Sequence, residues 1–247
     1  LGDVYKRQLE TRMISAYYDP NGVLWIGTNG GGVMCSDLRS QFYSRFYQDR
    51  HNEICSITMD NDCFVWLATY HKGIMRSMEP YETGKRLQFS TVYSAAGDAD
   101  ETVLCSLKDA KGNLWFGNKN GELVAYDVKS RQFSVYTLII DGNVSTSWVW
   151  ALYMDAHGFL WIGTEQGLLL FEPKKGVCRR LPVEQKLNSK EKLVVRAIVQ
   201  AEDGAIWLGT SNKGVCKVTV SASGDISAKI GYAVSYTHLT LPTNSLV

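Results

Sequence analysis

The amino-acid sequence predicts an all-β protein, a β-propeller of four-stranded antiparallel blades with five repeats. The first observation is a short phrase that occurs five times: an aliphatic residue, Trp, an aliphatic or aromatic residue, a small residue and usually Thr. The second is the spacing of these tryptophans, 41 to 49 residues, which is typical of one propeller blade per repeat. The third is that each repeat divides into four short apolar runs separated by turn residues, without a sustained helical period.

The five copies of the phrase mark the second strand of each predicted blade. They are Leu24–Thr28, Val65–Thr69, Leu114–Asn118, Leu160–Thr164 and Ile206–Thr210. The repeats around them cover about residues 11–47, 52–93, 101–137, 147–183 and 192–232. The repeats differ little: Ala68 replaces the glycine after the tryptophan, and Asn118 replaces the threonine.

The fourth repeat illustrates the order of strands and turns. Its first strand is predicted at Trp148–Met154, and Asp155–Gly158 forms a turn in which glycine can adopt a positive φ. The later strands are predicted at residues 159–164, 168–171 and 177–183. In the other repeats the first turn falls at residues 19–22, 60–63, 109–112 and 202–204, with Cys63 in place of a glycine, and the second turn ends at Gly32, Gly73, Gly121 and Gly214.

The recurring tryptophans are predicted to pack between neighbouring sheets. One four-stranded sheet cannot cover both of its faces, and radial stacking lets each blade bury them against its neighbours. An indole buries a large apolar area at such a contact, so packing explains these residues better than a ligand cage does. They are Trp25, Trp66, Trp115, Trp161 and Trp207. Replacing one with Ala is expected to cost about 3–5 kcal/mol.

The composition is that of an ordinary folded domain, and the net charge is too small to attract a charged partner over the whole surface. The chain has 247 residues, 45% of them hydrophobic and 21% charged, and a formal net charge of +1. This balance favours neither nucleic acid nor an acidic membrane surface. No apolar run approaches the roughly 18 residues of a membrane-spanning helix, and the first residues lack the pattern of a signal peptide. Direct membrane insertion by this segment is not expected.

The two ends and the cysteines are expected to carry no function. Residues 1–8 and about 233–247 break the repeat and resemble translated sequencing-adaptor sequence, so we expect both to be artefactual. The six cysteines show no CxxC pair and no zinc spacing with the four histidines. We expect them to be small apolar strand residues, which leaves the redox compartment open.

The repeat resembles the two-component regulator propeller repeat in its pattern Asp-x-x-Gly-x-Leu-Trp-Ile-Gly-Thr-x-x-x-Gly-Leu/Val. The resemblance covers about Thr11 to Tyr232 and is closest in the fourth repeat. In that family the repeats build the extracytoplasmic sensor regions of hybrid two-component histidine kinases. Tandem propellers there precede a β-sandwich, a membrane span and the kinase.

The resemblance implies a non-catalytic ligand-sensing segment that signals to transcription. Its expected partners are an oligosaccharide or another small extracellular ligand, further blades, and the downstream β-sandwich and kinase. A homodimer of the parent protein is compatible with it. The implied location is the periplasmic part of an inner-membrane protein, and no cofactor or metal is expected. Propellers of the family usually have seven blades, so five predict an incomplete, open propeller with apolar surface on its end blades.

The predicted ligand-binding residues lie on the rim formed by the turns between second and third strands. Tyr70, His71 and Lys72 offer a ring for a sugar face, an imidazole and an ammonium donor within one turn. Arg50, Asp98 and Asn143 occupy polar connections predicted to reach the same rim, where ordinary loop polarity is the alternative. His157, in the opposite turn, is expected to be a surface residue.

Two further candidates lie on the innermost strands. Trp148 and Trp150 are outside the recurring phrase, and Trp150 is either the floor of a sugar site or a core residue. Arg196, at the equivalent place in the last repeat, is either a donor to ligand or a structural partner for carbonyl or carboxylate groups.

Three other functions fit the sequence less well. The glycines between Gly27 and Gly32 do not form a phosphate loop, because a strand and not a helix is predicted after them. A protein-interaction propeller of the WD40 type is an alternative, although the third strands lack the Trp-Asp signature. A lyase or glycoside hydrolase would need paired carboxylates at the rim, for which Asp98, Glu101 and Glu165 are available.

Overall fold

The structure is a computed structural model that describes residues 12–37, 42–46, 53–82, 85–95, 101–181, 192–211, 213–219 and 229–234. Over these residues the strands form five four-stranded antiparallel sheets and one two-stranded hairpin. This confirms the predicted all-β propeller of four-stranded blades. None of the described residues belongs to a helix that is long and apolar enough to cross a membrane.

The five sheets are named blades 1 to 5 in chain order. Blade 1 contains β1 (Met13–Tyr18), β2 (Val23–Thr28), β3 (Val33–Asp37) and β4 (Phe42–Phe46). Blade 2 contains β5 (Ile54–Met59), β6 (Val65–Thr69), β7 (Ile74–Ser77) and β8 (Phe89–Tyr93). Blade 3 contains β9 (Val103–Lys108), β10 (Leu114–Asn118), β11 (Glu122–Asp127) and β12 (Gln132–Thr137).

Blades 4 and 5 follow a short hairpin that the sequence did not predict. The hairpin consists of β13 (Ile139–Ile140) and β14 (Asn143–Val144). Blade 4 contains β15 (Val149–Met154), β16 (Leu160–Thr164), β17 (Gly167–Glu172) and β18 (Val177–Arg180). Blade 5 contains β19 (Val195–Gln200), β20 (Ile206–Thr210), β21 (Val215–Thr219) and β22 (Lys229–Val234). Strand β22 thus enters the C-terminal segment that was expected to break the repeat.

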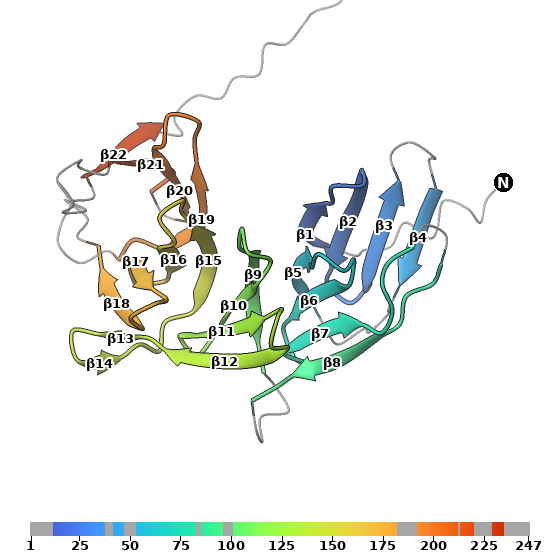
Figure 1. Cartoon of the computed structure of the whole chain (residues 1–247). Helices are drawn as coiled ribbons and strands as arrows, with labels where there is room; N and C mark the ends of the chain where they lie inside the picture. Colours follow the sequence, from blue (N-terminus) through green and yellow to red (C-terminus); the bar gives the residue numbers. More distant parts are fainter. Residues whose placement is uncertain are drawn as a thin grey trace, which may run out of the picture.

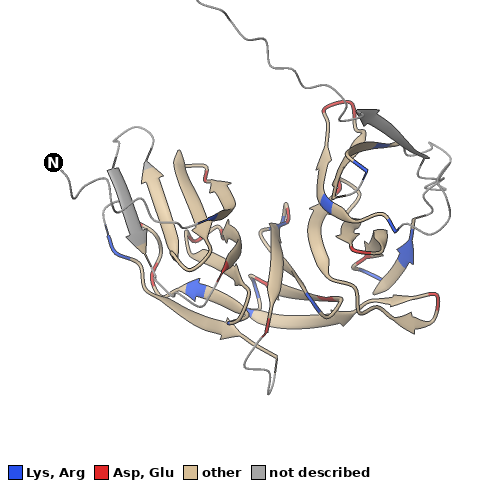
Figure 2. Ribbon diagram, turned by 180° about the vertical axis from the view of Figure 1, so that it is seen from behind, with Lys and Arg blue, Asp and Glu red and all other residues tan. Residues whose placement is uncertain are grey.

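The blades follow one another along an arc around a common axis. In each blade the strands are ordered as in the chain, and the first strands β1, β5, β9, β15 and β19 contact one another in succession. Figures 1 and 2 show the same arrangement from opposite sides, with blades 1 and 5 facing each other across an open side of the arc. Figure 2 also shows acidic and basic residues interspersed over the ribbon, in keeping with the small net charge.

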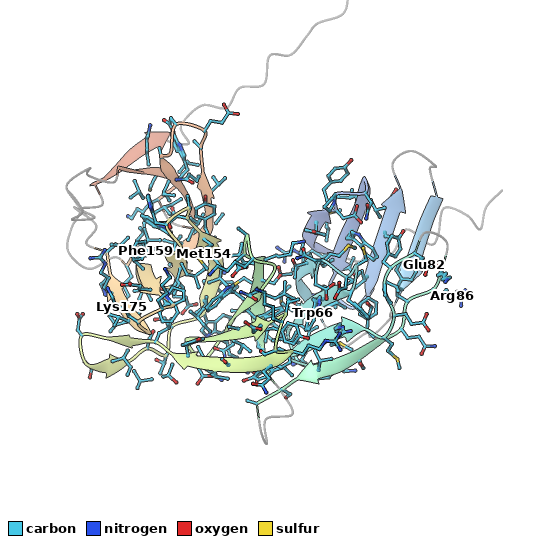
Figure 3. All side chains as sticks on the ribbon, in the orientation of Figure 1. Trp66, Glu82, Arg86, Met154, Phe159 and Lys175 are labelled. Atoms are coloured by element: carbon cyan, nitrogen blue, oxygen red, sulfur yellow. The ribbon has the colours of Figure 1, made fainter. Side chains whose placement is uncertain are left out.

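Apolar side chains fill the four spaces between neighbouring blades. Each space contains one cluster of buried residues, and each cluster includes the tryptophan of the earlier blade. Figure 3 shows the side chains between the sheets, with Trp66 pointing into the space between blades 2 and 3. Trp25, Trp66, Trp115 and Trp161 are buried, as packing predicts, and Trp207 is only half-buried because no further sheet of the described residues packs on that side of blade 5.

An aspartate six residues before the tryptophan explains why the first turn and the tryptophan recur together. In blade 4, Asp155 Oδ1 accepts hydrogen bonds from the backbone N–H groups of His157 and Phe159, and its Oδ2 accepts one from Trp161 Nε1 at 2.9 Å. Equivalent bonds to the tryptophan are made by Asp19, Asp60 and Asp109. Blade 5 carries Ala201 at this place and has no such bond.

The threonine of the phrase closes the turn between second and third strands. The hydroxyls of Thr28, Thr69 and Thr210 donate to the carbonyls of Gly32, Gly73 and Gly214. Strand β3 follows the first of these turns, so the glycines between Gly27 and Gly32 do not form a phosphate loop. The turn residues that recur in every blade therefore have structural roles.

Candidate functional site

The candidate site lies where the innermost strands approach the turns between second and third strands, which we call the second-turn rim. Near this rim the register between the first and second strands of every blade shifts by one residue, in the manner of a β-bulge. The residue skipped in each blade, here called the bulge position, is Ile14, Cys55, Leu104, Trp150 or Arg196. Bulges re-aim a side chain without changing the rest of a strand, so these positions can differ between blades.

The bulge positions of blades 4 and 5 bring together two of the predicted site residues. The guanidinium carbon of Arg196 lies 3.5 Å from the ring centroid of Trp150. The ring centroids of Trp148 and Trp150 are 5.2 Å apart, and Arg196 Nε donates to Ser211 Oγ at 2.8 Å. We call these four residues the Trp–Arg cluster. Sequence reasoning missed Ser211, and it placed Trp150 and Arg196 at equivalent positions without showing that they stack.

The Trp–Arg cluster combines aromatic faces with polar groups. This combination suits a polar ligand that also has apolar faces. Trp150 is half-buried, and its Nε1 is a buried donor that has no hydrogen-bond partner in the part of the chain that the structure describes. Arg196 is exposed and keeps its guanidinium over the indole, an arrangement that cation–π attraction favours. Exposed guanidinium and hydroxyl groups can hydrogen-bond sugar hydroxyls or an anion.

The remaining bulge positions carry no comparable chemistry. Ile14 and Leu104 are aliphatic, and Leu104 is buried. Burial, with a smaller contribution from the charge of Glu53, raises the pKa of the Cys55 thiol to about 12. Cys55 therefore stays protonated at neutral pH and is a poor nucleophile.

The turn Tyr70–Lys72 in blade 2 is held against blade 3. The rings of Tyr70 and His71 contact edge to face at a centroid distance of 4.8 Å. The Tyr70 carbonyl accepts a hydrogen bond from the Thr102 hydroxyl, and Lys72 forms a backbone bridge with Glu101. Tyr70 and His71 are half-buried and Lys72 is exposed. The turn thus presents its side chains from a fixed backbone.

A buried carboxylate below this turn was not singled out as a ligand-binding residue from the sequence. Glu101 is 1% exposed, its Oε2 accepts from the Ala95 N–H, and its Oε1 has no hydrogen-bond partner over the described residues. Burial, followed by the charges of Glu101 and Glu122, raises the pKa of Tyr93. No periodic pattern in the sequence marks Glu101, because burial of a carboxylate depends on the blade that packs over it.

The other predicted site residues are elsewhere or outside the described residues. Arg50 and Asp98 lie outside the described residues. Asn143 is exposed on the β13–β14 hairpin, which packs against the outermost strand β18 and not beside the innermost strands, so the structure does not group it with Trp150. His157 is exposed in the first turn of blade 4.

Known structures share this fold at low sequence identity. The chain matches the extracellular domain of BT4673 from B. thetaiotaomicron with a TM-score of 0.63 and 20% identity, over 81% of this chain and 26% of that one. It matches PorZ, a surface component of the type-IX secretion system of Porphyromonas gingivalis, with a TM-score of 0.63 and 14% identity, over 83% of this chain and 32% of that one. It therefore spans about a quarter to a third of the length of these two proteins.

A third structure is similar over more of its own length. The β-propeller domain of Cps50 (Swd1) from Myceliophteria thermophila matches with a TM-score of 0.59 and 14% identity, over 89% of this chain and 70% of that domain. No curated protein sequence matches the chain. The structural similarities, all below 25% identity, establish the β-propeller class.

Two segments of the chain match a family of repeats. The family described as "Two component regulator propeller" matches residues 9–30 and 143–166, which include the first two strands of blades 1 and 4. These two segments of the chain therefore match the two-component regulator propeller repeat.

Proposed function

We propose that this chain is the ligand-sensing segment of an extracytoplasmic propeller in a membrane-bound hybrid two-component histidine kinase. In this proposal it recognises an oligosaccharide on the second-turn rim, and the kinase chemistry belongs to other parts of the parent protein. The family match supports a sensor propeller, and the extracellular domain of BT4673 has the same fold.

The observation that carries the proposal is the Trp–Arg cluster. Packing between sheets explains the buried tryptophans of the recurring phrase, whereas Trp148 and Trp150 lie outside this phrase, contact each other at a tilted angle, and leave Trp150 beneath the exposed Arg196. Aromatic faces next to hydrogen-bond donors suit the apolar faces and hydroxyl groups of a sugar ring. The chemistry differs from blade to blade at the bulge positions, as expected of a recognition surface and not of a structural repeat.

Calorimetric titration of the chain with a panel of defined oligosaccharides tests this proposal. For an oligosaccharide that binds, Trp150→Ala or Arg196→Ala is expected to weaken affinity about tenfold or more, or about 1.4 kcal/mol. Ile14→Ala, at the bulge position of blade 1, is the matched control and is expected to leave affinity unchanged. Equal affinity in all three variants would remove the cluster from the binding site.

A second pair of variants tests whether the binding surface extends to blade 2. Tyr70→Ala and His71→Ala are expected to lower affinity for a longer oligosaccharide more than for a shorter one, because the turn lies two blades from the cluster. If these variants bind both lengths like the original chain, the binding surface is confined to blades 4 and 5.

The structure offers less support for an enzyme on this rim. Both carboxylate candidates that it describes, Glu101 and Glu165, belong to separate blades, and Glu101 is engaged by the backbone N–H of Ala95. Ligand binding, unlike hydrolysis or elimination, does not require a pair of carboxylates. We therefore adopt ligand binding as the function.

A further inference from the structure

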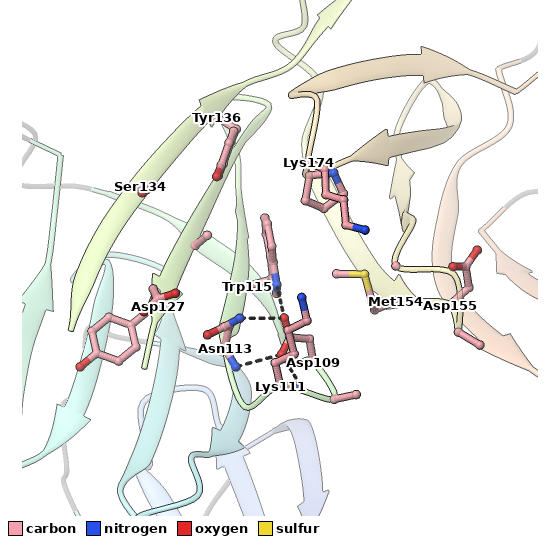
Figure 4. Close-up of a pocket in the computed structure, with 16 residues that line it drawn as sticks. Asp109, Lys111, Asn113, Trp115, Asp127, Ser134, Tyr136, Met154, Asp155 and Lys174 are labelled. Carbon is pink, nitrogen blue, oxygen red and sulfur yellow. Dashed lines mark hydrogen bonds between the residues drawn. The ribbon is translucent and has the colours of Figure 1, made fainter. Parts of the chain in front are cut away.

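A cavity opens between blades 3 and 4 on the face opposite the second-turn rim. Its volume is about 450 Å³, within the range usual for small-molecule sites. It lies beside the first turns of both blades, and Trp115, Tyr136 and Met154 form its apolar walls. Figure 4 shows Lys174 on one side of the opening, with Asp109 and Lys111 on the other. We call this cavity the blade 3–4 crevice.

A small residue across from Trp115 leaves room for the crevice. In blade 3 the cross-strand partner of Trp115 is Ala125, and the next partner along the sheet is Ser134. The residues at the place of Ala125 in blades 2 and 4 are Arg76 and Leu170. Arg76 covers its tryptophan, with the guanidinium carbon 5.4 Å from the ring, and Leu170 belongs to a buried cluster. The space that these side chains fill elsewhere is open in blade 3.

Two cations of the crevice have no ion-pair partner among the residues that the structure describes. Asp109 accepts hydrogen bonds from two backbone N–H groups, from Asn113 Nδ2 and from Trp115 Nε1. Asp155 is likewise occupied by its turn and by Trp161. In contrast, Lys111 and Lys174 are exposed and form no ion pair with any described residue.

A third carboxylate is also occupied within the protein. Asp127 Oδ1 accepts hydrogen bonds from the N–H and the hydroxyl of Ser130, which lower the pKa of this carboxyl group. The aspartates keep their negative charge but accept hydrogen bonds from their own turns, whereas Lys111 and Lys174 are the cationic side chains among the residues that line the crevice.

We propose that the blade 3–4 crevice binds a small organic anion that carries a carboxylate beside a ring with an apolar face. The ring would pack between Trp115, Tyr136 and Met154, above the small side chains of Ala125 and Ser134. The carboxylate would be bound by Lys111 and Lys174 at the opening. An aromatic acid and a uronic acid share this chemistry. The site is independent of the oligosaccharide surface proposed above, because it lies on the other rim and uses different residues.

Calorimetric titration of the full chain with four probes tests the ligand class. Phenylacetate and its neutral amide form one pair, and glucuronate and glucose form the other. At least one acid is expected to bind, with its neutral counterpart binding about tenfold more weakly or not at all. The pair that shows the difference identifies the source of the ring. Equal binding of acid and neutral probe, or no binding by any probe, would overturn the proposal.

Two variants locate the binding site. Ala125→Leu introduces the residue that blade 4 has at the equivalent place and is expected to abolish binding by filling the crevice. The double variant Lys111→Ala/Lys174→Ala changes only exposed residues and is expected to weaken acid binding about tenfold. Lys175→Ala is the matched control, because Lys175 lies in the same turn and pairs with Glu172 at 3.0 Å. Unchanged acid binding by the double variant, or equal losses in the double variant and the control, would contradict the assignment.

Discussion

The recurring tryptophan phrase lies in different environments in the internal and the terminal blades. All five residues of β6, of β10 and of β16 are buried. In β2 the residues alternate instead, with Val23 and Trp25 buried and Leu24 and Ile26 half-buried. In β20 the opposite face is the buried one: Ile206 and Leu208 are buried, whereas Trp207 is half-buried. The phrase thus specifies a sheet with two apolar faces, and the neighbouring blades determine which face is covered.

Blades 1 and 5 expose opposite sides of this repeating sheet. Blade 1 turns its tryptophan side toward blade 2, whereas blade 5 leaves its tryptophan side without a following blade. The Nζ atom of Lys217 lies 5.4 Å from the centroid of the Trp207 ring, so this side chain covers part of the indole. The terminal blades therefore provide natural controls for substitutions in the internal ones.

The largest expected difference is between Trp161 and Trp207. Trp161→Ala should lower the free energy of unfolding by about 3–5 kcal/mol, because a buried indole and its bond to Asp155 are lost. Trp207→Ala should cost less, about 1–2 kcal/mol, since this ring is only half-buried and has no aspartate partner in its first turn. Urea unfolding followed by circular dichroism measures both. Similar losses for the two variants would show that burial between blades does not set the contribution of the tryptophan.

A smaller difference is expected between the glycines that follow these tryptophans. A Cβ atom on Gly163 would lie 2.8 Å from Val195 Cγ1 of the next blade and 3.0 Å from the Val195 carbonyl oxygen. On Gly209 its nearest neighbour would be Ala197 Cβ at 3.2 Å, within the same blade. Gly163→Ala should therefore cost about 1–3 kcal/mol, and Gly209→Ala about 0.5 kcal/mol or less.

Thermal and urea unfolding of both glycine variants provide the measurement. Blade 2 already has the buried residue Ala68 at this place, so the cost depends on the local separation of blades and not on a special backbone conformation. Equal stability of the Gly163 and Gly209 variants would show that blades 4 and 5 are farther apart than the structure indicates.

The smallest predicted effect is a gain of stability in blade 5. Its first turn keeps the backbone hydrogen bonds of the other blades, from Ala201 N–H to Ala205 O and from Gly204 N–H to Ala201 O, but it lacks the aspartate. Ala201→Asp should restore the bond to Trp207 Nε1 and stabilise the chain by about 0.5–1.5 kcal/mol. Ala201→Asn is the control for charge, and a loss of stability in both variants would contradict this interpretation of the turn.

The fold could be predicted from the sequence because its cause is local and repeated. The tryptophan phrase, the Asp-x-x-Gly turns and the closing threonines each recur, and every copy supports the same assignment of strands. The β13–β14 hairpin was missed because it occurs once and has only two residues in each strand.

The site could be predicted only in part, because it depends on contacts between blades. Trp150 and Arg196 stand out as departures from the repeat, but their stacking follows from a bulge in each strand and the packing of β15 against β19. The blade 3–4 crevice could not be predicted from the sequence, because it depends on the small size of Ala125, an apolar residue at an ordinary strand position. The sequence pattern reveals which residues recur, whereas a missing side chain becomes visible only in three dimensions.

The skipped residue on each innermost strand has a consequence for how such proteins diversify. Because the bulge removes that residue from the strand pairing, exchanging its side chain leaves the hydrogen-bonded frame of the blade in place. Where this residue is not buried, as at Trp150 and Arg196, the blade contributes a side chain that can change without rebuilding the sheet. New specificities can accumulate blade by blade, through single substitutions that the scaffold tolerates.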